Sequence, residues 1–253
     1  MIKIQKQIGS LLIGLSISAA SPALAGTAAR AVGSGGVFPT LNHALDLNPA
    51  GLAESPSVSL QGLYNLDDSN IFGSATIGQN GFGAGFNYTR IDASSSSVEA
   101  FGFGAKLGKL MIGAAFNTTE FADMGINMGA TFDLKGLRVA AIVGGLTDSI
   151  TFVGAGIGVS MGMWGAEIDA GKAMITGIPD TYVFNAGIHA TMQSLSLGVG
   201  YKTTMVDSDL GDGDIWAGLS FAVTKGVSVE GFYKAGGSNL QLGDWSAGAR
   251  FEL

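Results

Sequence analysis

The C-terminal stretch of the chain, residues 244–253, has the alternating pattern of a β-strand with two different faces. Side chains of a strand point alternately to its two sides, so every second residue lies on the same face. One face of this stretch is entirely apolar and consists of Trp245, Ala247, Ala249, Phe251 and Leu253. The other face carries charge, polar groups and glycine: Asp244, Ser246, Gly248, Arg250 and Glu252. Such a strand suits a wall between an apolar and an aqueous medium, which few folds provide.

The order of residues in this stretch resembles the closing-strand signal of bacterial outer-membrane barrels, which the barrel assembly machinery reads. The resemblance implies that this machinery is a partner of the protein. It also implies that the closing strand pairs with the first strand, near residues 57–66. In that arrangement Trp245 and Phe251 face lipid at opposite rims.

Residues 1–25 have the three parts of a secretory signal peptide. Lys3 and Lys6 make its start basic, residues 8–20 form an apolar run, and Ala23-Leu-Ala25 is a small-x-small cleavage site. The apolar run is shorter than the about 20 residues that a membrane-spanning helix needs. We therefore expect export, with cleavage before Gly26. The sequence has no cysteine, so it predicts neither a lipid-attachment cysteine nor a disulfide framework.

A shortage of charge separates this chain from most soluble proteins. Asp, Glu, Lys and Arg make up 13% of its residues, against about 25% in typical soluble chains, and the mean hydropathy is +0.37. No window of about 18 apolar residues follows the signal peptide, which excludes helical spans. Removal of residues 1–25 leaves 11 basic and 20 acidic residues, a net charge of −9. Nucleic acid is therefore not expected as a partner.

We predict about fourteen strands of roughly ten residues, the length that a tilted strand needs to cross a bilayer. Short joins alternate with longer joins along the series, as in a barrel with turns at one rim and loops at the other. The predicted fold is an all-β transmembrane antiparallel up-and-down barrel over residues 56–253. Its strands are residues 57–66, 71–79, 81–91, 98–107, 110–119, 125–134, 137–146, 150–161, 163–172, 182–192, 195–206, 214–224, 227–235 and 244–253.

The joins also predict an orientation. An even number of strands places both ends of the mature chain at the rim with short turns, which faces the periplasm in such barrels. The long joins are acidic, whereas Lys109, Lys135 and Lys225 lie in short turns. We expect the protein in the outer membrane of a Gram-negative bacterium, surrounded by membrane lipid.

Alternation sorts each predicted strand into an apolar outer face and a polar, glycine-rich inner face. A charged side chain that faces lipid at mid-depth costs roughly 2 to 4 kcal/mol, whereas the lumen accepts it. Opposite charges on the inner face are expected to pair within the wall; the alternative is a polar path for translocation. The residues expected to line the lumen are Asn87, Lys106, Asn117, Asp133, Arg138, Glu167, Asp169, His189, Lys202, Glu230, Lys234, Arg250 and Glu252.

The segment ahead of the first predicted strand carries the motif Leu47-Asn-Pro-Ala-Gly-Leu-Ala53. In an exported fourteen-strand barrel, this motif resembles the N-terminal segment of the FadL-type outer-membrane transporters of long-chain fatty acids and other hydrophobic compounds. The resemblance implies that residues 26–55 fold into the lumen as a plug, which includes His43, Asp46, Asn48 and Pro49. The segment is shorter than the full plug of that family, and the outer loops lack its helical insertions. Fatty acid is therefore not implied as the substrate.

Two local features bear on the plug and the wall. Residues 41–53 are predicted to form one or two helical turns, broken at Pro49. Gly81, Gly83 and Gly85 in the third strand would permit a bulge or an opening in the wall. FadL-type proteins use such an opening for lateral release.

Signatures of catalysis and metal binding are missing from the sequence. Neither of its histidines, His43 and His189, belongs to a recognisable set of nucleophile, base and orienting group. The acidic stretch 207–214 lacks the spacing of a calcium-binding loop. We therefore expect no enzymatic activity, no cofactor and no metal site.

Together these patterns predict an outer-membrane channel or transporter. The expected process is passive uptake of a small hydrophobic ligand past the N-terminal plug. The alternative is a structural or assembly-partner barrel with a sealed lumen and no transport.

Overall fold

The structure is a computed structural model. It describes residues 44–45, 48–55, 58–67, 69–91, 96–119, 123–146, 150–175, 179–192, 194–206, 209–211, 213–236 and 244–252. The predicted signal peptide and most of the predicted plug, residues 26–43 and 46–47, lie outside these residues.

The described residues form one short helix and fifteen strands. The helix is a 3-10 helix, η1 (Pro49–Glu54), and it precedes all the strands. The strands are β1 (Val58–Asn65), β2 (Ile71–Gln79), β3 (Phe82–Ile91), β4 (Ser96–Leu107), β5 (Leu110–Thr119), β6 (Asp123–Asp133), β7 (Leu137–Gly144), β8 (Ile150–Met161), β9 (Trp164–Ile175), β10 (Thr181–Met192), β11 (Leu195–Val206), β12 (Asp209–Leu210), β13 (Asp214–Thr224), β14 (Val227–Gly236) and β15 (Asp244–Glu252).

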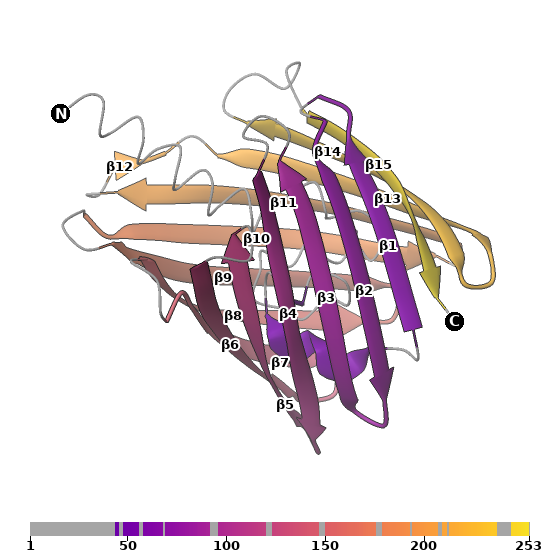
Figure 1. Cartoon of the computed structure of the whole chain (residues 1–253), viewed down its shortest axis with the longest axis horizontal. Coiled ribbons are helices and arrows are strands. Elements are labelled where there is room, and N and C mark those ends of the chain that lie inside the picture. Colours follow the sequence, from indigo (N-terminus) through magenta and orange to yellow (C-terminus); the bar gives the residue numbers. More distant parts are fainter. Residues whose placement is uncertain are drawn as a thin grey trace.

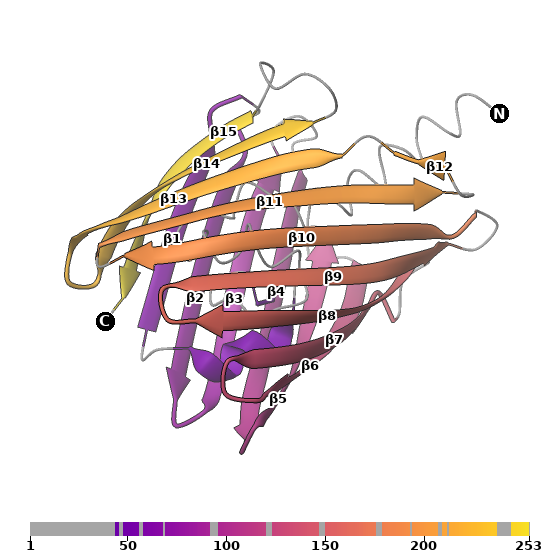
Figure 2. The ribbon, with the colours of Figure 1, turned by 180° about the vertical axis from the view of Figure 1, so that it is seen from behind.

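Antiparallel pairing closes the sheet into a barrel. Each long strand pairs with the long strands before and after it, and β1 pairs with β15 from Ser59–Glu252 to Asn65–Ser246. β12 has two residues and pairs with the end of β11 beside the wall, so among the described strands fourteen make the barrel. Figures 1 and 2 show the two opposite walls: β1 to β5 run steeply on one side, and β8 to β13 cross behind them. η1 lies between these walls.

Tight turns fix one rim of the barrel, called here the short-turn rim. Asn80 and Gly81 both have positive φ, at 54° and 79°, as do Lys135 and Gly136, at 59° and 100°. Two successive positive φ values are the mark of type I′ turns, whose twist matches that of the strands they join. The opposite ends of the strands form the long-loop rim. The alternation of short turns and long loops agrees with the prediction.

The structure confirms the predicted antiparallel barrel of fourteen strands. Five strands, β2, β5, β8, β11 and β13, have the predicted bounds. β12 was not predicted, because its two residues belong to the acidic stretch 207–214, whose composition is typical of a loop. The glycines that would permit a bulge or an opening form neither: Gly81 lies in the turn before β3, and β3 keeps an unbroken register with β2 and β4 through Gly83 and Gly85. The register shift in this structure lies between Ala222 and Thr224, at the end of β13.

The outer face of the wall is apolar and exposed. In β1 the burial alternates strictly, with Leu60 and Tyr64 exposed and Leu63 buried, and the apolar residues of the other strands continue this outer band. By alternation and register, all five tyrosines of the chain lie on this face toward the long-loop rim: Tyr64, Tyr88, Tyr182, Tyr201 and Tyr233. Aromatic girdles of this kind mark the boundary between hydrocarbon and water in membrane barrels. Within the described residues, no helix has the length and hydropathy to cross a bilayer.

The three tryptophans provide a direct test of the two faces. Trp164 and Trp245 lie on the outer face near opposite rims, each with 55% of its surface exposed, whereas Trp216 lies on the inner face with 4% exposed. In variants that keep one tryptophan and carry phenylalanine at the other two positions, vesicles of brominated lipid should quench the fluorescence of Trp164 and Trp245. Trp216 should keep its fluorescence. Quenching of Trp216 to the same degree as the other two would contradict the assignment of faces.

Candidate functional site: the inner wall and the segment packed on it

Residues Asn48–Ser55 form what we call the inner segment. Asn48 caps the start of η1, because its side-chain oxygen accepts a hydrogen bond from the Ala50 amide at 3.1 Å and its carbonyl accepts one from Gly51 at 3.0 Å. Pro49 is the first helical residue, where its fixed φ favours the helix and its missing N–H costs nothing. The predicted break at Pro49 is therefore wrong: the proline begins the helix.

A row of five glycines forms the seat of the inner segment. Gly78, Gly83, Gly104, Gly113 and Gly129 come from β2 to β6, and each pairs with the next across the sheet. A Cβ atom at any of them would come closer than 3.0 Å to an atom of the inner segment. Most of these atoms belong to the backbone of the segment, so only glycine permits the approach. The glycines thus replace side-chain packing by direct contact between two backbones.

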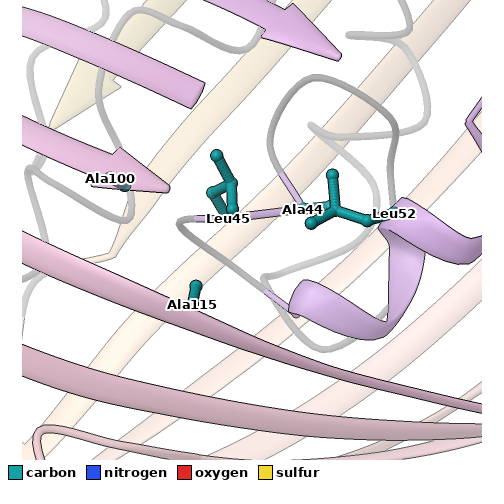
Figure 3. Packing of buried hydrophobic residues seen from close by; sticks show 5 residues of the cluster. All are labelled: Ala44, Leu45, Leu52, Ala100 and Ala115. Carbon is teal, nitrogen blue, oxygen red and sulfur yellow. The ribbon is translucent and has the colours of Figure 1, made fainter. Parts of the chain in front are cut away.

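Apolar side chains add a small core beside this seat. Leu45 and Leu52 form a buried cluster with Ala44 and with Ala100 and Ala115 of β4 and β5. Figure 3 shows both leucines in the space between the helix and the strands that carry the two alanines. Ala50 and Ala53 form a second buried cluster with Met111 of β5. At this half of the wall the inner face thus takes part in two small apolar clusters, although alternation predicts polar groups and glycine there.

An arginine joins the end of the inner segment to the wall. Arg138 of β7 donates two hydrogen bonds to the Glu54 carboxylate, from Nη1 at 2.9 Å and from Nη2 at 2.6 Å. Its Nε also donates to Asp133 of β6, at 3.1 Å. At the other end of the segment, Asn48 Nδ2 donates to the hydroxyl of Thr131, also in β6, at 3.3 Å. Both ends of the inner segment are thus bound to the β6–β7 hairpin.

A second charged network lies at the seam where the barrel closes. Glu230 of β14 accepts hydrogen bonds from Gln61 Nε2 of β1 at 2.7 Å and from Ser228 at 3.3 Å. Arg250 of β15 lies between these strands, with Nε at 3.6 Å from Glu230 and Nη1 at 3.2 Å from Glu252. The Glu230 side chain is fully buried, whereas that of Glu252 is 35% exposed. This network joins three strands across the closure.

The opposite half of the inner wall mixes charge with aromatic rings. Lys234 Nζ lies 3.7 Å from Asp214 and 5.0 Å from the centre of the Trp216 ring. Trp216 packs on Phe232 with 5.3 Å between the ring centres. Further along the inner wall, Asn185 of β10 donates a hydrogen bond to Asp169 of β9 at 2.7 Å. Apolar solutes and ions would both find contacts on such a surface.

The register and alternation place the predicted lumen residues on the inner face. β3 to β7 carry Asn87, Lys106, Asn117, Asp133 and Arg138, and β14 and β15 at the seam carry Glu230, Lys234, Arg250 and Glu252. β9 to β11 carry Glu167, Asp169, His189 and Lys202. The structure brings Asp133 together with Arg138, and Arg250 together with Glu230 and Glu252. His189 packs against Gly165, where a Cβ atom would meet its ring. Of the predicted plug residues, Asn48 and Pro49 lie in the inner segment, and His43 and Asp46 lie outside the described residues.

Sequence reasoning missed several members of these clusters. Glu54 ends the helix, and Asp214 begins β13. The available signals were an acidic residue near the end of the predicted plug and another at the start of a predicted strand. Nothing in the sequence indicated the contact made by Gln61, because uncharged polar residues are common on the inner face of such strands. Trp216 lies two residues after Asp214, and Phe232 lies two residues from both Glu230 and Lys234, so the strand pattern alone places both rings on the inner face. In the described part of the chain, no group of three or more acidic or histidine side chains is placed to hold a metal ion.

Solved structures that superpose on this barrel include outer-membrane proteins and channels. Omp33 of Acinetobacter baumannii superposes with a TM-score of 0.59 at 13% identity, over 78% of this chain and 98% of that chain. The CymD monoaromatic hydrocarbon channel superposes with a TM-score of 0.61 at 10% identity, over 86% of this chain and 94% of that chain. The chain has an outer-membrane β-barrel fold. At such identities the likeness concerns the fold alone.

The sequence itself matches no family model and no curated protein. The kinship of residues 47–53 with FadL-type transporters therefore stays a prediction.

The glycine seat can be tested with a matched pair of substitutions. Gly113→Ala places a Cβ against the backbone of Pro49, whereas Gly62→Ala on the outer face meets open space. We expect the first change to lower the free energy of unfolding by about 1–3 kcal/mol, because the seat is overpacked. The second should stay within about 0.5 kcal/mol of the native protein. Urea unfolding in lipid vesicles measures both, and equal effects would contradict the seat.

The seam network predicts unequal effects of two charge removals. Arg250→Met leaves the buried Glu230 carboxylate without its cation, and loss of one partner of a buried pair costs about 3–5 kcal/mol. Glu252→Gln removes a part-exposed partner, for which about 0–1 kcal/mol is typical. The same urea unfolding experiment separates the two. A milder effect of Arg250→Met than of Glu252→Gln would show that the network does not hold the seam.

Proposed function

We propose that the protein is a channel of the Gram-negative outer membrane for passive uptake of small hydrophobic molecules. The observation that carries this proposal is the one-sided position of the inner segment. Its main described contacts are with β2 to β6, whereas the inner faces of β9 to β15 carry their own charged and aromatic residues. A segment held against one side narrows the lumen and leaves the opposite wall to line a path.

The aromatic and aliphatic residues of the inner wall support a hydrophobic solute. Leu63, Phe72, Trp216 and Phe232 are inward by alternation, and their strands β1, β2, β13 and β14 meet at the barrel seam around β15. Apolar side chains on the inner face of a barrel offer contact to an apolar molecule that a purely polar lumen would not. The likeness to a monoaromatic hydrocarbon channel points the same way. Membership of the FadL type would agree with such a solute.

The mechanism in this proposal needs no energy source. A solute enters at the long-loop rim, passes between the inner segment and the opposite wall, and leaves at the short-turn rim. Residues 26–55 act as the plug that sets the width of this path. Export by the signal peptide of residues 1–25 and insertion by the barrel assembly machinery precede these steps.

A sealed structural barrel is the second candidate, and the buried inner wall favours it. Asn87, Glu167, Asp169 and Glu230 are each less than 9% exposed, and the arginines of the inner face are paired. Such a barrel would carry no solute, and its outer faces or loops would bind a partner protein.

Deletion of residues 26–55 distinguishes the two candidates. We expect faster uptake of N-phenyl-1-naphthylamine into vesicles and a larger conductance in planar bilayers for the deletion variant than for the mature protein, because the plug narrows the path. A change in its electrophoretic mobility on heating must first show that the variant is folded. If the mature protein and the deletion variant are both folded and neither shows uptake or conductance, the channel is refuted and the sealed barrel is supported.

A further inference from the structure

Two kinds of ion pair occupy the inner wall, and they differ in what happens when they break. The pair between Arg250 and Glu230 joins strands of the seam, and the Glu230 side chain is fully buried. The pair between Arg138 and Glu54 joins the wall to the inner segment, and these side chains are 19% and 26% exposed. Breaking a buried pair leaves an uncompensated charge, whereas a part-exposed carboxylate regains water. The first pair therefore holds the wall permanently, and the second can open at low cost.

Arg138 also keeps a partner when Glu54 leaves. Its guanidinium contacts Asp133 through Nε and Nη2, both at 3.1 Å. Asp133 lies directly opposite Arg138 in the register of β6 and β7, so it does not depend on the inner segment. Release of Glu54 thus exposes no unpaired arginine. Arg138 is shared between a fixed carboxylate and a detachable one.

The glycine seat lets the inner segment separate from the wall. Gly83, Gly104 and Gly113 present no side chains toward the segment, so along this row backbone lies on backbone. The side-chain contacts that an opening must break are the two small clusters around Leu52 and Met111. The polar contacts of its two ends instead go to the β6–β7 hairpin, through Asn48 to Thr131 and through Glu54 to Arg138. Because the segment is held on the glycine row by backbone contact and at each end by one polar side-chain contact, it can move away from the wall as one rigid unit.

We propose that Glu54 and Arg138 form a latch that holds the inner segment on the glycine row and whose opening widens the lumen. This proposal rests on the channel function proposed above and names its regulation. The Asn48–Thr131 hydrogen bond is the second point of attachment, and Asp133 stabilises Arg138 in the open state. The latch lies at the short-turn rim, because Glu54 reaches the start of β7 and the end of β6.

The latch can be tested with a cysteine reporter, because the chain has no cysteine of its own. Ala50→Cys places a thiol in the inner segment, where the native side chain is fully buried. In this background, Glu54→Gln removes the charge of the latch, and Asp180→Asn removes a carboxylate that pairs with Lys172 on the outer side of the wall. The rate of reaction with a water-soluble maleimide is measured for each in lipid vesicles, alongside uptake of N-phenyl-1-naphthylamine.

We expect Glu54→Gln to raise the labelling rate of the introduced thiol by about tenfold or more, the scale of one charge-assisted hydrogen bond. Uptake should rise with it. Asp180→Asn should leave both rates unchanged. Arg138→Lys, which keeps the charge but loses the paired geometry, should give rates between those of Asp180→Asn and Glu54→Gln. Labelling in Glu54→Gln within twofold of the Ala50→Cys parent would overturn the latch.

The outcomes separate the latch from the channel. If deletion of residues 26–55 raises uptake while Glu54→Gln changes neither labelling nor uptake, the channel stands and the latch is refuted. If Glu54→Gln raises labelling while no variant shows uptake, the latch holds the segment as proposed but the channel function fails.

Discussion

The pairing of β1 with β15 is the constraint on which the rest of the structure depends. It satisfies the backbone groups of both strands and removes the free edges that an open sheet would present. Once the sheet is closed, each strand has one face outside and one inside, and the alternation in the sequence assigns them. The buried network of Gln61, Glu230 and Arg250 lies at this closure and adds side-chain contacts to the backbone pairing.

Closure also creates an interior that must be filled, lined or hydrated. The two halves of the inner wall differ in how they do this. Along one row of β2 to β6 the wall carries glycine instead of side chains, so the backbone of the inner segment lies directly on the wall. On β9 to β15 the wall keeps charged and aromatic residues of its own. This asymmetry connects the fold to the proposed channel, because a segment attached to one half narrows the lumen without replacing the opposite wall.

Alternation and turn residues made the barrel predictable from sequence, since each depends on residues close together in the chain. The seat was not predictable in this way. Gly78, Gly83, Gly104, Gly113 and Gly129 become neighbours only through the register of five strands. The glycines at inward positions could be recognised in the sequence. The sequence does not show whether such a glycine marks a bulge in the strand or a close approach of another backbone. Of the two partners of Arg138, only Asp133 was predictable, because it lies across a short turn from the arginine. Glu54 is 84 positions away in the sequence.

The position of the inner segment on the glycine row can be measured by nuclear Overhauser contacts in methyl-labelled protein in lipid nanodiscs. We expect a contact between the Leu52 methyl groups and the α-protons of Gly85, because a Cβ at Gly85 would lie 3.0 Å from Leu52 Cδ2. Leu52 methyl groups in contact with water and with no proton of β3 in the folded protein would show that the segment does not lie on this row.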